Sequence, residues 1–234
     1  MNALIIFVFL AFAGAMIIYG FHISAKREEV WKNTAQRLNL EFVESGWFSK
    51  ISMHGIYRGK GVQVRHETET RGSGKHSSTI HFAAISVDLE DSCWGALSLS
   101  RHGFGDSIAK FFGGEDLEVG HARFDADFRI KGRLDDRLRQ CLNTPAVQST
   151  IRGTSRMYGS FKIEGGKISI REEGMFTCEN ELTTMIERAI DTAITLDEAL
   201  SGGGSASEEE ADELLFPDVS TRHTDGEEQS SAIW

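Results

Sequence analysis

An uncharged apolar run near the first residue constrains this chain more than any other feature. Residues Ala3 to Phe21 read ALIIFVFLAFAGAMIIYGF, nineteen residues without a charged side chain. At about 1.5 Å per residue, a helix of this length crosses a hydrocarbon core that is ~30 Å thick. The run therefore predicts one membrane-spanning helix, and residues 1–23 form the predicted anchor.

A cleaved signal peptide is the alternative interpretation of the same run. Signal peptides begin with Lys or Arg, and their apolar part ends at small residues next to the cleavage site. Here Met1 and Asn2 are uncharged, and the apolar run continues beyond the small residues at positions 13–15. Both observations favour a helix that stays in the membrane.

The charges that follow the run predict its orientation. No basic residue precedes the run, whereas the segment directly after it contains Lys26, Arg27, Lys32 and Arg37. Lysine and arginine accumulate in the cytoplasmic segments that flank membrane helices. We therefore expect a single-pass membrane protein whose water-soluble part faces the cytoplasm, with the lipid bilayer as its first partner.

The cysteines agree with a reducing compartment. The chain has three, Cys93, Cys141 and Cys178, and such an odd, widely spaced set is a poor disulfide framework. None has a neighbouring histidine or basic cluster in the sequence, so we expect packing residues and not reactive thiolates. A domain on the other side of the membrane, with one disulfide and one free thiol, is the alternative.

Acidic charge is concentrated at the end of the chain. The formal net charge is −10, of which residues 201–234 supply −8 through nine Asp or Glu residues against Arg222. The nearly neutral remainder gives no electrostatic case for nucleic acid as a partner, because nucleic-acid binding needs a concentrated basic face. The run Ser201-Gly202-Gly203-Gly204-Ser205 opens this segment, which is too polar to bury a core and is predicted to be a disordered acidic tail.

One apolar island interrupts the acidic tail. It consists of Leu214, Leu215 and Phe216, which follow Glu213 and are flanked by further carboxylates. Apolar islands in acidic segments often serve as docking motifs for a protein partner, although a polar tail also contains such islands by chance. The island is the predicted partner-binding segment, and both interpretations stay open.

Residues 24–200 alternate between helical and strand periodicity, which predicts an α+β domain. A juxtamembrane helix over residues 28–40 precedes an antiparallel meander over residues 51–89, where a change of apolar phase near Ala83-Ala84 predicts a β-bulge. The other predicted elements are a helix over 104–112, a strand over 119–132, a helix over 134–142, a hairpin over 161–170 and a helix over 182–195. We expect the last helix to cover one face of a mainly antiparallel sheet, which is either open or partly closed as a barrel.

A short motif lies in the predicted strand over 119–132. It combines a glycine, a Phe-Asp-x-x-Phe sequence and a second glycine, at positions Gly120, Phe124, Asp125, Phe128 and Gly132. The motif resembles a segment of uncharacterised bacterial single-pass membrane-anchored proteins, and the likeness extends loosely from Trp31 through the C-terminal helix. That family commonly has an acidic residue where this chain has His121. The resemblance implies a membrane-tethered α+β domain and no particular activity.

Two carboxylates in the same segment are candidates for chemistry. Asp125 and Asp127 alternate with apolar residues, which places both on one face of the predicted strand. Paired carboxylates serve acid–base catalysis when a cleft separates their pKa values, but the sequence supplies neither a partner base nor a walled pocket. We therefore predict that Asp125 bonds a neighbouring backbone turn or an arginine, with Asp127 and His121 as further polar candidates.

No metal site and no cofactor is predicted. The histidines of the sheet region lack the spacing of zinc ligands, and the sequence contains neither H-E-x-x-H nor C-x-x-C. These histidines are His66, His76, His81, His102 and His121. The sequence also lacks a phosphate-binding glycine loop and a nucleophile elbow.

Taken together, the patterns favour a binding or scaffolding protein that presents an α+β domain and an acidic tail at the cytoplasmic membrane face. The alternative is a membrane-tethered enzyme whose site combines scattered polar residues of the sheet, such as His66, His81, Asp125 and Asp127. A deep pocket that gathers these side chains would favour the enzyme.

Overall fold

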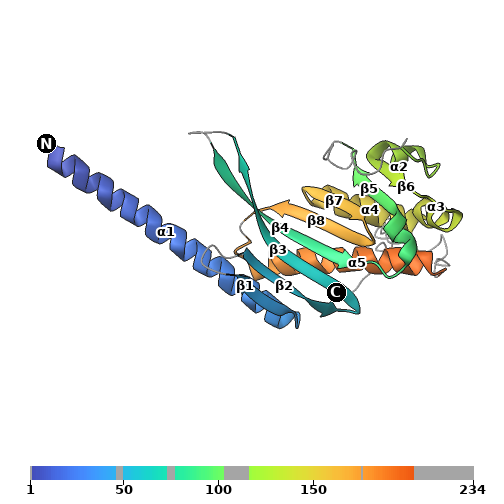
Figure 1. Ribbon diagram of the computed structural model, residues 1–234, viewed down its shortest axis with the longest axis horizontal. Helices are drawn as coiled ribbons and strands as arrows, with labels where there is room; N and C mark the ends of the chain where they lie inside the picture. The colour runs from blue at the N-terminus through green and yellow to red at the C-terminus, as the bar shows by residue number, and fades with distance from the viewer. Residues whose placement is uncertain (1, 46–49, 73–76, 103–115, 175, 203–234) are drawn as a thin grey trace, which may run out of the picture.

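Eight antiparallel strands form one open sheet in the order β1-β2-β3-β4-β8-β7-β5-β6 (Figure 1). This computed structural model describes residues 2–45, 50–72, 77–102, 116–174 and 176–202. The strands are β1 (Glu41–Ser45), β2 (Lys50–Tyr57), β3 (Lys60–Arg71), β4 (Ser78–Asp88), β5 (Leu97–Arg101), β6 (Phe128–Gly132), β7 (Ser160–Glu164) and β8 (Lys167–Glu173). The helices are α1 (Asn2–Arg37), the 3₁₀ helix η2 (Ser92–Ala96), α2 (Ala122–Asp127), α3 (Asp136–Asn143), α4 (Pro145–Met157) and α5 (Glu179–Leu200). The predicted α+β class, with an antiparallel sheet and a C-terminal helix, is confirmed.

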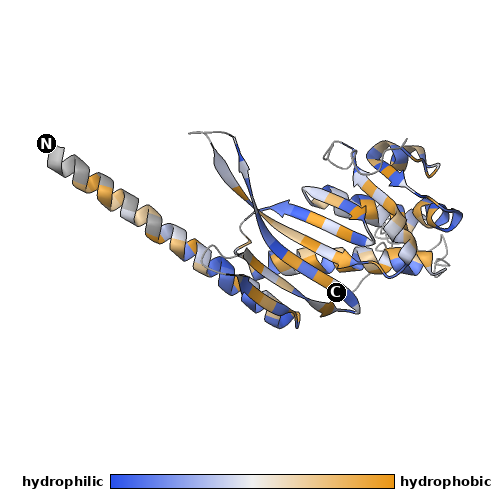
Figure 2. Cartoon of the chain, viewed as in Figure 1, coloured by the Kyte–Doolittle hydropathy of each residue, from blue (hydrophilic) through white to orange (hydrophobic). Residues whose placement is uncertain are grey.

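Two rows of apolar side chains cross one face of the sheet. The strand register aligns the first row as Phe42, Met53, Val64, Ile85, Ile170 and Phe161. It aligns the second row as Val62, Val87, Ile168, Ile163, Leu99 and Ile130. Every member except Phe42 is buried. Because alternate residues of a strand point to the same face, these rows form the strand half of the core, and Figure 2 shows the resulting alternation of hydrophobic and hydrophilic residues.

Helices cover this apolar face. α5 packs against β3, β4 and β8, α4 packs against α5 and β7, and the second half of α1 packs against α5, β1 and β2 (Figure 1). The buried stripe of α5 includes Leu182, Met185, Ile186, Ala189, Ile190 and Ala193. Their helical spacing is the one that predicted this element, so the expectation that the C-terminal helix covers one face of the sheet is confirmed.

α1 is one helix from Asn2 to Arg37 and joins the predicted anchor to the predicted juxtamembrane helix. Its second half enters the core through Trp31, Ala35 and Leu38, which are almost completely buried. Its first half projects beyond the sheet, where Figures 1 and 2 show an isolated, largely hydrophobic helix. Among the residues that the structure describes, no helix is long and apolar enough to cross a membrane.

The partly closed barrel is wrong, because β1 and β6 are free edges of an open sheet in the described part of the chain. A barrel would turn its apolar face inward onto itself, whereas helices α1, α4 and α5 supply the apolar surface here. The β-bulge near Ala83-Ala84 is also wrong, because the pairing of β3 with β4 is continuous. The apparent change of phase arises because Phe82, on the opposite face, is covered by the guanidinium of Arg171, 3.6 Å from its ring centroid.

The strand predicted over residues 119–132 is correct only for β6, since residues 122–127 form α2. The side chain of His121 caps this helix by accepting a bond from the backbone N–H of Phe124, 3.4 Å away. Only Phe124 is buried in this helix, and the alternating Ala122 and Ala126 are exposed. The alternation of residue types therefore reflected small exposed alanines and not a buried strand face. The helix predicted over 104–112 lies outside the described residues.

A buried ion pair ties β3 to the end of α5. Lys60 Nζ lies 2.6 Å from Asp197 Oδ2 and 2.6 Å from Glu90 Oε1, and Lys60 and Asp197 are both buried. The Asp197 carboxylate also accepts the backbone N–H of Glu90 at 3.2 Å. Each buried charge thus has an opposite charge and a hydrogen bond, which is the condition for burying it without a large penalty. This network fixes the end of α5, where the acidic tail begins.

Candidate functional site

The carboxylates of the motif segment bond to different neighbours. Asp125 accepts the backbone N–H groups of Val119 at 2.9 Å and Gly120 at 3.1 Å, and so closes the loop before α2. Asp127 Oδ2 instead lies 3.1 Å from Nε of Arg152 on α4. The two carboxylates therefore do not act as a pair, and each has a contact that holds α2 in place.

The four residues of the enzyme alternative do not form one site. His66 is on β3 and His81 on β4, whereas Asp125 and Asp127 are on α2, which packs against β6. Strands β8, β7 and β5 lie between β4 and β6 in the sheet. A deep pocket that gathers several of these side chains would favour the enzyme, and neither of the two grooves in the described part of the chain is lined by any of the four.

His66 and His81 nevertheless meet each other, next to a buried arginine. Their rings stack with centroids 5.2 Å apart, and His66 Nε2 lies 3.0 Å from His81 Nδ1. Arg27 Nη1 approaches the same His66 Nε2 at 3.2 Å. Since arginine has no acceptor, His66 Nε2 must accept, which places the proton of neutral His66 on Nδ1 and a donating N–H on Nδ1 of His81. We call these three residues the Arg27–His66–His81 cluster.

The cluster has an excess of hydrogen-bond donors. Arg27 is 6% exposed, and no carboxylate forms an ion pair with it among the described residues. Arg27 Nε, Trp31 Nε1 and Thr34 Oγ1 are buried without a hydrogen-bond partner in the same part of the chain. These three positions lie at i, i+4 and i+7 on the face of α1 that meets the sheet. Buried donors without acceptors cost free energy. The cluster, together with Trp31 and Thr34, therefore makes part of the contact between α1 and the sheet polar, whereas the rest of it is apolar.

The geometry explains why His66 stays neutral. Burial, the charge of Arg27 and the neighbouring His81 together lower the pKa of His66 to about 4. Protonation of Nε2 would remove the acceptor that Arg27 and His81 share and would place two buried cations in contact. Burial and Arg27 lower the pKa of His81 in the same direction.

This arrangement predicts that acid weakens the contact between α1 and the sheet. The folded-state pKa of His66 lies below the ordinary value of 6.5, so the unfolded chain binds more protons between these values. The contribution of neutral His66 to the free energy of unfolding is therefore complete above about pH 6.5 and is lost as the pH falls toward 4. In urea unfolding of the full chain in detergent, the wild type should lose about 1–2 kcal/mol more between pH 7 and pH 5 than His66→Gln. Equal losses in the two proteins would show that His66 does not titrate this way.

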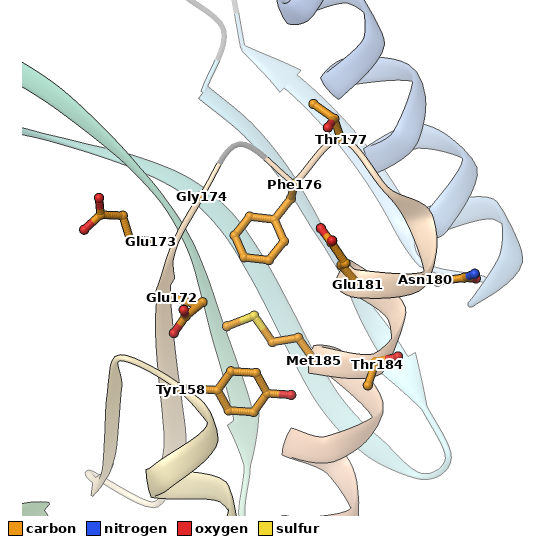
Figure 3. A pocket seen from close by; sticks show the side chains of 10 residues that line it. All are labelled: Tyr158, Glu172, Glu173, Gly174, Phe176, Thr177, Asn180, Glu181, Thr184 and Met185. Atoms are coloured by element: carbon orange, nitrogen blue, oxygen red, sulfur yellow. The ribbon is translucent and has the colours of Figure 1, made fainter.

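An open groove lies at the end of the sheet that contains the Arg27–His66–His81 cluster (Figure 3). It has a volume of about 630 Å³ and lies between the end of β8 and the start of α5. Phe176, Met185 and Tyr158 lie along it, and Glu172, Glu173 and Glu181 lie at its sides (Figure 3). A hydrogen bond from the backbone N–H of Gly174 to the carbonyl of His81, 2.9 Å long, joins the groove to the strand of the histidine cluster.

The titratable groups of the groove are carboxylates and one phenol. Its described lining residues include Glu172, Glu173, Glu181 and Tyr158, and no histidine, cysteine or lysine. Burial raises the pKa of Tyr158, so its hydroxyl stays protonated near neutral pH. Phe176 has a positive φ of 46°, a conformation that a bulky residue adopts at an energetic cost. This groove was not predicted from the sequence, because its shape depends on how the end of β8 turns into α5 and how Tyr158 packs beside them.

The cysteines are free thiols, and Cys141 is buried. Burial raises the pKa of Cys141 to about 12, and a hydrogen bond with Asp91 is the main cause that raises the pKa of Cys93. Neither is a thiolate at neutral pH. No group of three or more potential metal ligands occurs among the described residues. The predicted partner-binding residues Leu214, Leu215 and Phe216 lie outside the described residues.

No protein-family model matches this chain, and no curated protein or solved structure matches it. The resemblance of residues 119–132 to bacterial membrane-anchored proteins stays a prediction.

Proposed function

We propose that this protein is a single-pass membrane-anchored binding protein, which holds its α+β domain and acidic tail at the cytoplasmic face of a membrane. The observation that carries this proposal is the form of α1. One continuous helix begins with the apolar run and ends in the domain core.

The projecting half of α1 exposes large apolar side chains that nothing in the described part of the chain covers. Their exposed fractions range from 57% to 73%. The residues are Phe7, Val8, Leu10, Phe12, Met16, Ile18, Tyr19 and Phe21. At 100° per residue they point to several sides of the helix, as in a segment surrounded by lipid. Burying each one would contribute roughly 1.5–3 kcal/mol.

The sequence of the run supports the anchor where side chains are not described. The uncharged stretch of nineteen residues from Ala3 to Phe21 includes positions 3–6, 9, 13 and 17, whose side chains lie outside the described part. The residues at these positions are all apolar. A helix of nineteen residues is long enough to cross a bilayer core. The proposal for the span thus rests on the sequence and on the exposed apolar residues together.

The side of the membrane follows from the residues after the run. Lys26 and Lys32 are exposed on α1 close to the proposed membrane surface, and Arg37 ends the helix. Such basic residues favour the cytoplasmic side. The free thiols of Cys93, Cys141 and Cys178 fit a reducing compartment.

We assign partner recognition to the acidic tail, where Leu214, Leu215 and Phe216 supply apolar contacts and carboxylates steer the encounter with a basic partner surface. A pull-down from solubilised membranes tests this assignment. Deletion of residues 203–234 should abolish co-purification of the main protein partner. Replacing Leu214, Leu215 and Phe216 together by Ala should remove most of it, while replacing Val219, Ser220 and Thr221 by Ala, a matched control in the same tail, should leave it intact. Full retention of the partner by the deletion would mean that recognition lies elsewhere.

A further inference from the structure

A second groove in the domain is basic. It has a volume of about 720 Å³ and lies between α2 and α4. Its lining residues include Arg123, Arg152, Arg156 and His121, and none of the described lining residues is acidic. We call it the α2–α4 groove. It concentrates positive charge in a body that is nearly neutral outside the tail, so an anionic ligand would be attracted to it.

The arginines of the α2–α4 groove are available to a ligand to different degrees. Arg123 and Arg156 are exposed and form no ion pair among the described residues. Arg152 Nε lies 3.1 Å from Asp127 Oδ2 as an ion pair, and neither Nε nor Nη2, both buried, has a hydrogen-bond partner in that part of the chain. Guanidinium groups bind carboxylates through two parallel hydrogen bonds. Arg123 and Arg156, which are exposed, can therefore bind a ligand with several carboxylates, and Arg152 adds its charge beside them.

The chain itself carries such a ligand close by. α5 ends at Leu200, whose carbonyl accepts a bond from Arg137 Nη2 on α3 at 3.1 Å. α3 packs against α4, and only Thr144 separates the two helices. The acidic tail therefore starts on the side of the domain where α3 and α4 lie. The six residues from Gly203 to Glu208 can span up to ~20 Å when extended.

We propose that the acidic segment from Glu208 to Phe216 binds in the α2–α4 groove of its own chain. Glu208, Glu209, Glu210, Asp212 and Glu213 supply the carboxylates for the arginines. Leu214, Leu215 and Phe216 then lie against the domain and are withheld from other proteins. Because the tail is tethered, its effective concentration at the groove is on the order of millimolar, which makes even weak contacts sufficient.

This inference deepens the proposed function and rests on it only in one respect, the role of the tail in partner recognition. A partner with a basic surface would have to displace the arginines of the α2–α4 groove before it contacts the apolar island. The groove would thus set the affinity of the tail for its partner. The contact between groove and tail does not depend on the membrane anchor.

A peptide-binding assay on the full chain in detergent tests the proposal. The probe is a fluorescein-labelled peptide with the sequence of residues 206–220, and its anisotropy reports binding. The receptor is a full-length variant in which Glu208, Glu209, Glu210 and Glu213 are replaced by Gln and Asp212 by Asn, so that its own tail no longer competes. This variant should bind the peptide at least tenfold more tightly than the wild-type chain, and the affinity should fall as salt rises.

Charge reversal in the groove provides the matched control. In the neutral-tail background, Arg123→Glu with Arg156→Glu should weaken peptide binding at least tenfold, whereas Arg65→Glu with Arg133→Glu, exposed positions outside the α2–α4 groove, should change it less than twofold. Equal binding by the neutral-tail and wild-type chains would overturn the proposal, because the groove would then be open to an external ligand. An affinity for the peptide that is unchanged by Arg123→Glu with Arg156→Glu would overturn the proposal as well. Either result leaves membrane anchoring, which is measured separately, untouched.

Discussion

Ile85→Asp should unfold the domain. Ile85 is 1% exposed and lies in the middle of an apolar row, paired with Val64 on β3 and Ile170 on β8. No basic group lies in this row, so the new carboxylate would be buried without a partner at a cost of several kcal/mol. This cost approaches the total stability of an ordinary domain, which is about 5–15 kcal/mol. Circular dichroism and thermal melting of the full chain in detergent should show no cooperative transition of the domain.

Ile85→Val is the matched control for this prediction. It removes one methylene group from the same position and should cost only about 0.5–1.5 kcal/mol, with a cooperative melt. If Ile85→Asp melted cooperatively near the wild-type temperature, the central position of Ile85 in the core would be refuted.

Deleting residues 3–21 should abolish membrane association. The deletion removes the whole uncharged run, including the exposed apolar residues of the projecting half of α1. No other large patch of exposed apolar residues accompanies them, since the remaining exposed large apolar residues in the described part are Ile56 and Met157. In a density gradient, the full chain should float with lipid vesicles and the deletion variant should stay at the bottom.

A variant that lacks residues 203–234 controls for nonspecific effects of shortening the chain, and it should float as the full chain does. Flotation of the variant without residues 3–21 would show that another surface holds the protein on lipid. In that case the proposed anchor would be wrong even if the domain and tail behaved as expected.

Periodicity in the sequence predicted much of the sheet and the main helices. The hairpin over 161–170 is confirmed as β7 and β8, joined by Gly165 and Gly166 with φ values of 60° and 74°. Two successive positive φ angles are what a tight hairpin turn requires, and glycine adopts them without strain. Such a local cause is visible in the sequence. β1, β5 and α4 were not predicted, because the two strands are short and α4 mixes polar with apolar residues.

Side-chain contacts explain why the segment over 119–127 misled the prediction. A strand and a short helix both fit its pattern, and the choice depended on bonds from His121 and Asp125 to nearby backbone N–H groups. Such bonds compete with a strand ladder for the same groups. The predicted bond from Asp125 to a neighbouring turn matches the contacts with Val119 and Gly120, although the face shared with Asp127 does not exist.

The polar cluster could have been found in part from the sequence. The β3–β4 hairpin pairs His66 with Ala83 and Thr68 with His81, so the two histidines are diagonal neighbours on one face. A correct register for this hairpin brings the rings together. The position of Arg27 over them depends on how α1 packs across the sheet, which no local pattern determines. The same holds for both grooves, whose shapes depend on how neighbouring helices and strands pack.

The side of the membrane on which the domain lies is the most direct test of the account. A reporter pair fused after Leu200 distinguishes the two sides, because green fluorescent protein fluoresces in the cytoplasm and alkaline phosphatase is active only outside it. The four basic residues that follow the apolar run predict fluorescence and no phosphatase activity. Active phosphatase together with a dark fluorescent fusion would contradict the proposed orientation, and with it the cytoplasmic role assigned to the domain and its tail.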